Sequence, residues 1–150
     1  MDFYLVRHGE AAAGALDPQR SLTRVGRQNV ERVGSLAVAR GVQVSVIFHS
    51  GILRARQTAE ILAECLSPPH GVQALSGLLP QDDPVIARGE LELSQTSVML
   101  VGHLPHLSRL AALLVHGNSE REAVNFAPAT LACCSNEGSI WKITWLLSPA

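Results

Sequence analysis

Short apolar runs alternate with segments of helical periodicity along most of this chain, and that alternation restricts the fold more than any other feature. Residues 2–7, 42–49 and 97–102 are short and rich in β-branched or other apolar residues, which is typical of buried strands. Apolar side chains recur at helical spacing over 23–40 and over 50–67. Strands that alternate with helices form parallel sheets covered on both faces. We therefore predict a three-layer α/β/α sandwich with a mostly parallel central sheet.

The remaining elements are predicted from the same patterns. They are a weak strand at 72–75, a helix at 84–93, a helix at 104–115, and strands at 129–135 and 139–147 joined by a hairpin turn at 136–138. Thr23 is expected to cap the first helix and Ser50 the second. Pro68 ends the second helix, because the residue before a proline avoids helical geometry.

Composition limits the partners of the chain. With 150 residues, 47% of them hydrophobic, the chain is long enough to bury a core, so residues 1–150 are expected to form a single domain. A net charge of −1 gives no electrostatic footprint for nucleic acid or for an anionic membrane. The three cysteines lack zinc-like spacing and are read as reduced packing residues. No signal peptide is apparent, and we expect a cytoplasmic monomer.

Basic and hydroxyl side chains follow three of the predicted strands. Arg7 and His8 follow the first strand, Ser50 and Arg54 follow the second, and His103 follows the strand at 97–102. Ligands of open α/β sheets bind outside the carboxyl ends of the strands, so these side chains are expected to meet at one edge. Such a cationic cluster would repel itself without an anion, and a tetrahedral phosphoryl group suits guanidinium donors well.

Histidines in a phosphate site indicate chemistry beyond binding. A neutral imidazole can attack phosphorus, which splits hydrolysis into phosphoryl transfer to histidine and attack by water, without a metal. A metal site built from His8, His49 and His103 is the alternative, and the neighbouring arginines oppose a cation there. The other three histidines, His70, His106 and His116, are expected to be ordinary surface or helix residues. His106 lies one helical turn from His103 and could reach the pocket rim.

Four segments resemble, in order and spacing, the motifs of the histidine phosphatase superfamily, which includes the phosphoglycerate mutases. They are LVRHGEA at 5–11, LTRVGRQ at 22–28, HSGILRARQTAEIL at 49–62 and LVGHLPHL at 100–107. Because it is short, the chain most resembles the small bacterial phosphohistidine phosphatases of the SixA type. The resemblance implies a phosphoglycerate mutase-like fold without the insertions of the mutases.

The resemblance also implies roles for individual residues. His8 would be the nucleophile that becomes phosphorylated, Arg7 and Arg54 would hold the phosphoryl oxygens, and His103 would complete the pocket. Gly9 and Ser50 are expected to bind substrate as well, and Arg20 matches an arginine of the small phosphatases that would contact the incoming phospho-group. No cofactor is implied.

The chain departs from the family pattern at two places. Larger members use an acidic residue in the middle of the chain as general acid, and the small phosphatases often carry Pro-Glu after the third strand, where this chain has Ser76 and Gly77. Three carboxylates remain as possible donors, or no acid is needed: Asp82, Asp83 and Glu10. The usual Ser-Pro of the second motif is Ser-Gly here, at 50–51, which is expected to loosen the helix entry.

Three functions are therefore considered. The first is a metal-independent phosphohistidine phosphatase acting on a phosphohistidine-bearing signalling or phosphotransfer protein, favoured because a phosphohistidine imidazole can leave already protonated. The second is a phosphatase or mutase for a small phosphorylated metabolite, which predicts further basic residues around the pocket. The third is a binding module for phospho-groups without turnover, which the presence of the complete set of pocket residues opposes.

Overall fold

A six-stranded β-sheet forms the middle layer of the computed structural model, which describes all 150 residues. The strands are β1 (Asp2–Arg7), β2 (Ile47–His49), β3 (Val72–Ala74), β4 (Met99–Gly102), β5 (Leu131–Glu137) and β6 (Ile140–Leu147). The helices are α1 (Arg24–Ala39), α2 (Leu53–Leu66), α3 (Pro84–Leu93) and α4 (His106–His116). None of these helices combines the length and apolar character needed to cross a membrane.

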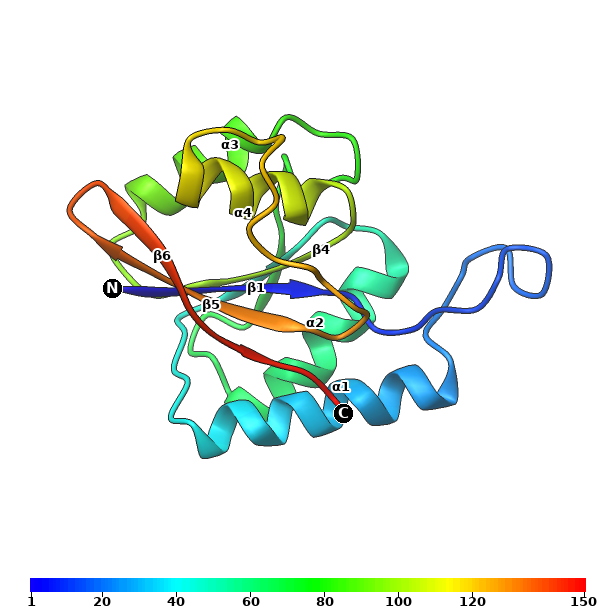
Figure 1. Cartoon of the computed structure of the whole chain (residues 1–150). Coiled ribbons are helices and arrows are strands. Elements are labelled where there is room, and N and C mark those ends of the chain that lie inside the picture. Colours follow the sequence, from blue (N-terminus) through cyan, green and yellow to red (C-terminus); the bar gives the residue numbers. More distant parts are fainter.

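The sheet has the order β3-β2-β4-β1-β5-β6. The first four strands in this order pair in parallel, whereas β5 is antiparallel to both β1 and β6. Figure 1 shows α3 and α4 on one face of the sheet and α1 and α2 on the other. The predicted α/β/α sandwich with a mostly parallel sheet is confirmed.

The central strand β1 contributes to both layers of the core. Tyr4 and Val6 pack with residues of α1 and α2, while Phe3 and Leu5 pack with residues of α3 and α4. All four side chains are buried, as expected for a strand covered on both faces. Burying one such side chain stabilises the fold by about 2 kcal/mol, so β1 is held firmly where it delivers the residues that follow it.

Two predicted strand ranges are corrected. The strand expected at 42–49 is paired only at 47–49, because Val42 and Val44 are buried in the core without joining the ladder. The β-branched pattern there reports burial rather than pairing. The hairpin turn lies at Gly138 and Ser139 rather than at 136–138, since β5 continues to Glu137 before the chain reverses.

The helix starts also differ in part from prediction. Thr23 caps α1 as expected, with its Oγ1 accepting the Gly26 N–H at 2.9 Å. Ser50 is not the N-cap of α2, which begins after Ile52 and has no side-chain cap. The helix predicted at 104–115 begins at His106, after Pro105.

Candidate active site

The carboxyl ends of β1, β2 and β4 meet at one edge of the sheet and bring their following residues together. The His8 N–H donates to the Gly102 carbonyl at 3.0 Å, which ties the end of β1 to the end of β4. The imidazole rings of His8 and His103 lie with centroids 5.0 Å apart. Ser50, after β2, lies within hydrogen-bond distance of His103. The parallel arrangement of the three strands thus places the predicted cluster at one edge.

His8 is held as a neutral imidazole with one free nitrogen. Its Nδ1 lies 2.7 Å from the Gly9 carbonyl, an acceptor, so the ring proton is on Nδ1 and the lone pair is on Nε2. The side chain is only 8% exposed, and burial lowers its pKa to about 4. The positive charges of Arg54, Arg7 and Arg20 lower it further, although the Gly9 carbonyl acts in the opposite direction. A neutral imidazole with an exposed lone pair is the form that can attack phosphorus.

A hydrogen-bond chain fixes the backbone around His8. The Gly9 N–H donates to Thr58 Oγ1 at 3.0 Å, and the Thr58 hydroxyl donates to the Arg54 carbonyl at 2.8 Å. Gln57 accepts the Leu22 N–H at 2.8 Å. The sequence analysis assigned no role to Thr58 or Gln57, and α2 carries enough other polar residues that these two did not stand out.

Three donors around His8 are buried without a partner. They are Arg7 Nε, Arg54 Nε and His103 Nδ1. Burial lowers the pKa of both arginines, and the charge of Arg20 lowers that of Arg54 further. The far end of Arg7 is anchored, because its guanidinium donates to the Phe126 carbonyl at 2.9 Å. Buried donors are normally paired, so this group has the hydrogen-bonding needs of a site for a multivalent anion.

His103 is the most buried of the pocket histidines. It is 2% exposed, and its Nε2 lies 2.6 Å from Ser50 Oγ. Burial lowers its pKa to about 3, and the charges of His8 and Arg54 act in the same direction. A bound phosphoryl group would reverse this effect, because its negative charge favours a proton on the ring. His103 is therefore able to share a proton with a phosphoryl oxygen.

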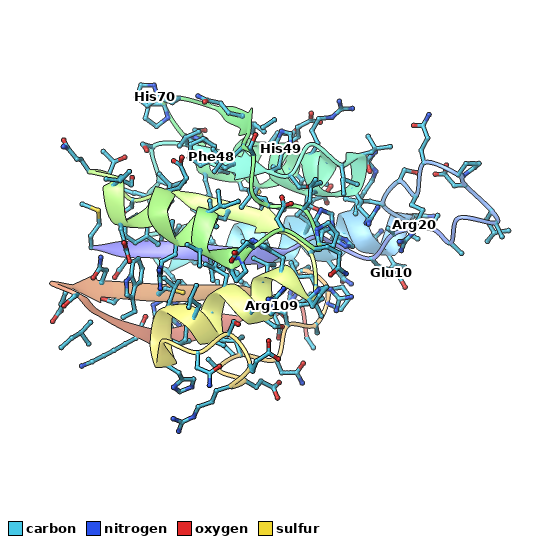
Figure 2. The ribbon with its side chains drawn as sticks, turned by 90° about the horizontal axis from the view of Figure 1, so that it is seen from above. Glu10, Arg20, Phe48, His49, His70 and Arg109 are labelled. Carbon is cyan, nitrogen blue, oxygen red and sulfur yellow. The ribbon has the colours of Figure 1, made fainter.

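Arg20 and Glu10 lie at the same end of the molecule, beyond the end of β1 (Figure 2). Arg20 is exposed, has a left-handed backbone with φ 52°, and donates from Nε to the Ala12 carbonyl at 3.1 Å. Its charge reaches the pocket, since it contributes to the lowered pKa of His8 and of His103. Arg20 thus borders the site, consistent with a contact to an incoming group.

The three carboxylates considered as proton donors all accept structural hydrogen bonds. Asp82 accepts the Leu79 N–H at 2.9 Å, and Asp83 caps α3 by accepting the Val85 N–H at 3.0 Å. Glu10 accepts the Thr23 hydroxyl at 2.7 Å. Each of the three carboxylates therefore has a structural role.

Gly77 stands where the resemblance predicts the glutamate of Pro-Glu, and its surroundings are closely packed. Gly77 is buried and has φ +95°, a backbone conformation that favours glycine. A Cβ at this position would lie 2.5 Å from Ile86 Cγ2, so any side chain there would require the Ile86 side chain to shift. The departure from Pro-Glu is thus built into the local packing.

His106 is a helix residue as expected, the first of α4, and it is fully buried. Neither ring nitrogen has a partner within hydrogen-bond geometry, although the backbone of Gly77 is close enough to act on its pKa. Burial lowers its pKa, with an opposing contribution from the nearby charge of Asp82. The positively charged form of His106 would also lower the pKa of His103. His106 lies four residues before Leu110, so helical spacing already placed it on the apolar face of α4.

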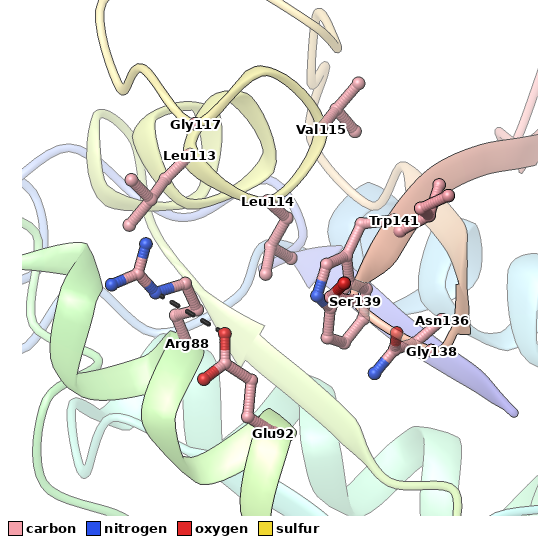
Figure 3. Close-up of a pocket in the computed structure, with 11 residues that line it drawn as sticks. Arg88, Glu92, Leu113, Leu114, Val115, Gly117, Asn136, Gly138, Ser139 and Trp141 are labelled. Carbon is pink, nitrogen blue, oxygen red and sulfur yellow. Dashed lines mark ion pairs between the residues drawn. The ribbon is translucent and has the colours of Figure 1, made fainter.

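One cavity lies beside the site and another lies away from it. A cavity of about 490 Å³ adjoins Ser50 and is lined by residues between the end of β3 and the first turn of α3, namely Ala74, Leu75, Ser76, Gly77, Leu79, Asp82 and Ile86. Another, of about 580 Å³, lies between α3, the end of α4 and the β5–β6 hairpin and includes the Arg88–Glu92 ion pair (Figure 3). The second shares no residue with the cluster. No group of three or more His, Cys, Asp or Glu side chains is placed to hold a metal ion.

Comparison with known proteins identifies the family. The family model of the histidine phosphatase superfamily (branch 1) matches residues 3–78. The chain belongs to this superfamily. It is 28% identical to the phosphohistidine phosphatase SixA of Escherichia coli over 99% of its length and 94% of that protein. It is also 35% identical to an uncharacterized protein of Picosynechococcus, over 79% of this chain and 76% of the relative.

A solved structure places this histidine phosphatase among the small members of its superfamily. The structure of the protein histidine phosphatase SixA complexed with tungstate superposes with a TM-score of 0.88 at 28% identity, covering 99% of this chain and 97% of the other. The predicted phosphoglycerate mutase-like fold and the resemblance to the SixA type are confirmed. The protein is therefore a phosphatase, a hydrolase of the histidine phosphatase class.

The buried histidines of this phosphatase predict a loss of stability in acid. The pKa values of His8 and His103 are lowered to about 4 and about 3, and those of His49 and His106 are also lowered. Between these values and about 6.5, the unfolded chain binds more protons than the folded one. We expect the free energy of unfolding to be at its highest above pH 7. It should fall by at least about 3 kcal/mol by pH 4.

Urea denaturation at pH 7, 6, 5 and 4 measures this loss. The variant His8→Asn should show a smaller fall, because one of the shifted groups is gone. A free energy of unfolding that stays constant over this range would contradict the assignment of buried neutral histidines.

Proposed function

We propose that this protein is a metal-independent protein phosphohistidine phosphatase that works through a covalent phosphohistidine intermediate on His8. The observation that supports it most is the neutral His8 ring, with its Nδ1 proton tied to the Gly9 carbonyl, beside the unpartnered buried donors of Arg7, Arg54 and His103. The likeness to SixA, a phosphohistidine phosphatase, supports the substrate class.

In the first step, His8 Nε2 attacks phosphorus while the P–N bond of the substrate breaks. The electron pair of that bond leaves with the substrate imidazole, which departs as a neutral ring when its other nitrogen already carries a proton. Arg7, Arg54 and His103 stabilise the charge on the phosphoryl oxygens during the transfer.

In the second step, water attacks the phosphoryl group on His8. The Nδ1 proton, held by the Gly9 carbonyl, makes the phosphorylated ring a cation, so it leaves as the same neutral imidazole that began the cycle. The water protons go to the phosphate product. The balance is phosphohistidine plus water giving histidine and inorganic phosphate.

No general acid is assigned, because the leaving imidazole needs none. We expect Asp82→Asn and Asp83→Asn each to keep kcat on a phosphohistidine-bearing protein within about threefold of the wild type. Steady-state phosphate release measures this, with thermal unfolding to correct for the loss of the Asp83 cap and of the Asp82 hydrogen bond to Leu79. A hundredfold fall in kcat for either folded variant would show that the carboxylate donates a proton.

The alternative, a phosphatase or mutase for a small phosphorylated metabolite, is less well supported. The cavity beside Ser50 is lined by eight residues, none of them Lys or Arg, and includes Asp82. Further anionic groups of a metabolite would find no charge partner there. An apolar and hydroxyl-lined cavity is better matched to the uncharged surroundings of a protein imidazole.

A side-by-side assay tests the proposal. Phosphate release from a phosphohistidine-bearing phosphotransfer domain is compared with release from p-nitrophenyl phosphate, in the presence of a metal chelator. We expect release from the phosphohistidine donor to be faster by at least about a hundredfold in kcat/KM and unaffected by the chelator. Faster release from the ester would move the protein to metabolite chemistry, and release from neither would support the binding-module alternative.

A further inference from the structure

His49 and Gly51 flank Ser50 and are joined to each other by a hydrogen bond. The Gly51 N–H donates to His49 Nδ1 at 3.0 Å, so the His49 ring is neutral with its proton on Nε2. His49 is the last residue of β2 and only 5% exposed, and burial lowers its pKa, which keeps Nδ1 available as an acceptor. The catalytic steps proposed above make no use of this buried ring.

The conformation of Gly51 depends on glycine and explains the departure from Ser-Pro. Gly51 has φ +90°, a left-handed conformation, and nothing lies within 4 Å of the place where a Cβ would be. A proline is restricted to φ near −65° and has no N–H to donate. The glycine therefore permits a turn that a proline would exclude, and the His49 bond counters the looseness expected from it.

Ser50 connects this turn to the pocket. Its Oγ accepts the Ile52 N–H at 3.2 Å and lies 2.6 Å from His103 Nε2. The backbone on either side of Ser50 is thus held by the His49 ring, which accepts from Gly51. If that acceptor were lost, the turn would keep only the bond from the Ile52 N–H, and we expect the Ser50 hydroxyl to move relative to His103.

We infer that His49 is a positioning residue of the phosphoryl-transfer site, holding the turn at Gly51 so that Ser50 stays against His103. This inference rests on the proposed function for its effect on catalysis. His49 acts through Ser50 and needs no contact with the substrate. The charged groups that act on it are Arg56 and Glu60, which form an exposed ion pair on α2.

Three substitutions at His49 separate positioning from packing. His49→Leu removes the acceptor, His49→Asn places Oδ1 at the position of Nδ1, and His49→Gln places its acceptor one bond farther out. We expect the Leu and Gln variants to lower kcat about tenfold with little change in KM, and Asn to return kcat to within about threefold of wild type. A role in packing alone would rank the variants by thermal stability instead.

Binding of tungstate, a tetrahedral oxyanion, gives a readout that does not need turnover. Calorimetric titration should show about fivefold weaker binding to the Leu and Gln variants and near-normal binding to Asn. Wild-type kcat in the Leu variant, or equal losses in Asn and Gln, would overturn the inference, and the Asn–Gln pair decides it if Leu does not fold. If tungstate binding ranked the variants in this order but the wild type hydrolysed no phosphohistidine, the proposed function would be refuted. The positioning role of His49 would stand.

Discussion

Replacing His8 with alanine should lower kcat on a phosphohistidine-bearing protein by at least about 10⁴-fold, because the nucleophile of the first step is lost. The remaining donors still bind the phospho-group, so binding of the substrate should fall far less than turnover. The variant also loses the shifted pKa of a buried histidine, and it should be at least as stable as wild type at pH 5.

The matched control is His70→Ala, which removes an exposed imidazole outside the four motifs. It should leave phosphate release unchanged. Rapid-quench assays of both variants measure the effect, together with a melting curve to show that each is folded. A His8→Ala enzyme that retains more than about one hundredth of the wild-type rate would rule out His8 as the obligatory nucleophile.

Replacing Arg54 or Arg7 with alanine should lower kcat on the order of a hundredfold or more, the usual cost of removing a donor that stabilises transition-state charge. Each guanidinium has a buried Nε without a partner in the absence of substrate, so each offers donors to a phosphoryl oxygen. Arg54→Lys keeps the charge and loses the planar fork, and it should fall between wild type and alanine.

Two measurements separate this effect from a loss of structure. Arg7 also donates to the Phe126 carbonyl, so Arg7→Ala is expected to melt earlier, whereas Arg54→Ala is not. Arg88→Ala provides the control, because Arg88 forms an ion pair with Glu92 on α3, away from the cluster. If kcat stayed within about threefold of wild type in both active-site variants, the arginines would have no part in phosphoryl transfer.

Much of the fold follows from periodicity in the sequence. The ranges of β1 and of α3 agree with the predictions at 2–7 and 84–93. Strand ends next to polar residues also predicted where the cluster would form, because parallel strands present their carboxyl ends at one edge. A run of β-branched residues indicates burial but does not show which residues pair with a neighbouring strand. For this reason only three residues of the strand expected at 42–49 are paired.

The finer geometry of the site depends on contacts that one sequence does not display. Ser50 was expected to cap a helix, and its hydroxyl instead bonds to His103, which is distant in the chain. Thr58 positions Gly9 across a similar gap. Each of these facts is set by tertiary contacts rather than by local pattern.

A single-turnover experiment tests the central claim most directly. Excess enzyme is mixed with a phosphotransfer domain carrying ³²P-phosphohistidine, in the presence of chelator, and quenched in alkali at successive times. We predict that label appears on His8 as the donor loses it, and then declines as inorganic phosphate forms. Phosphate that appears without any labelled enzyme, or at the same rate from His8→Ala, would contradict the covalent phosphohistidine mechanism.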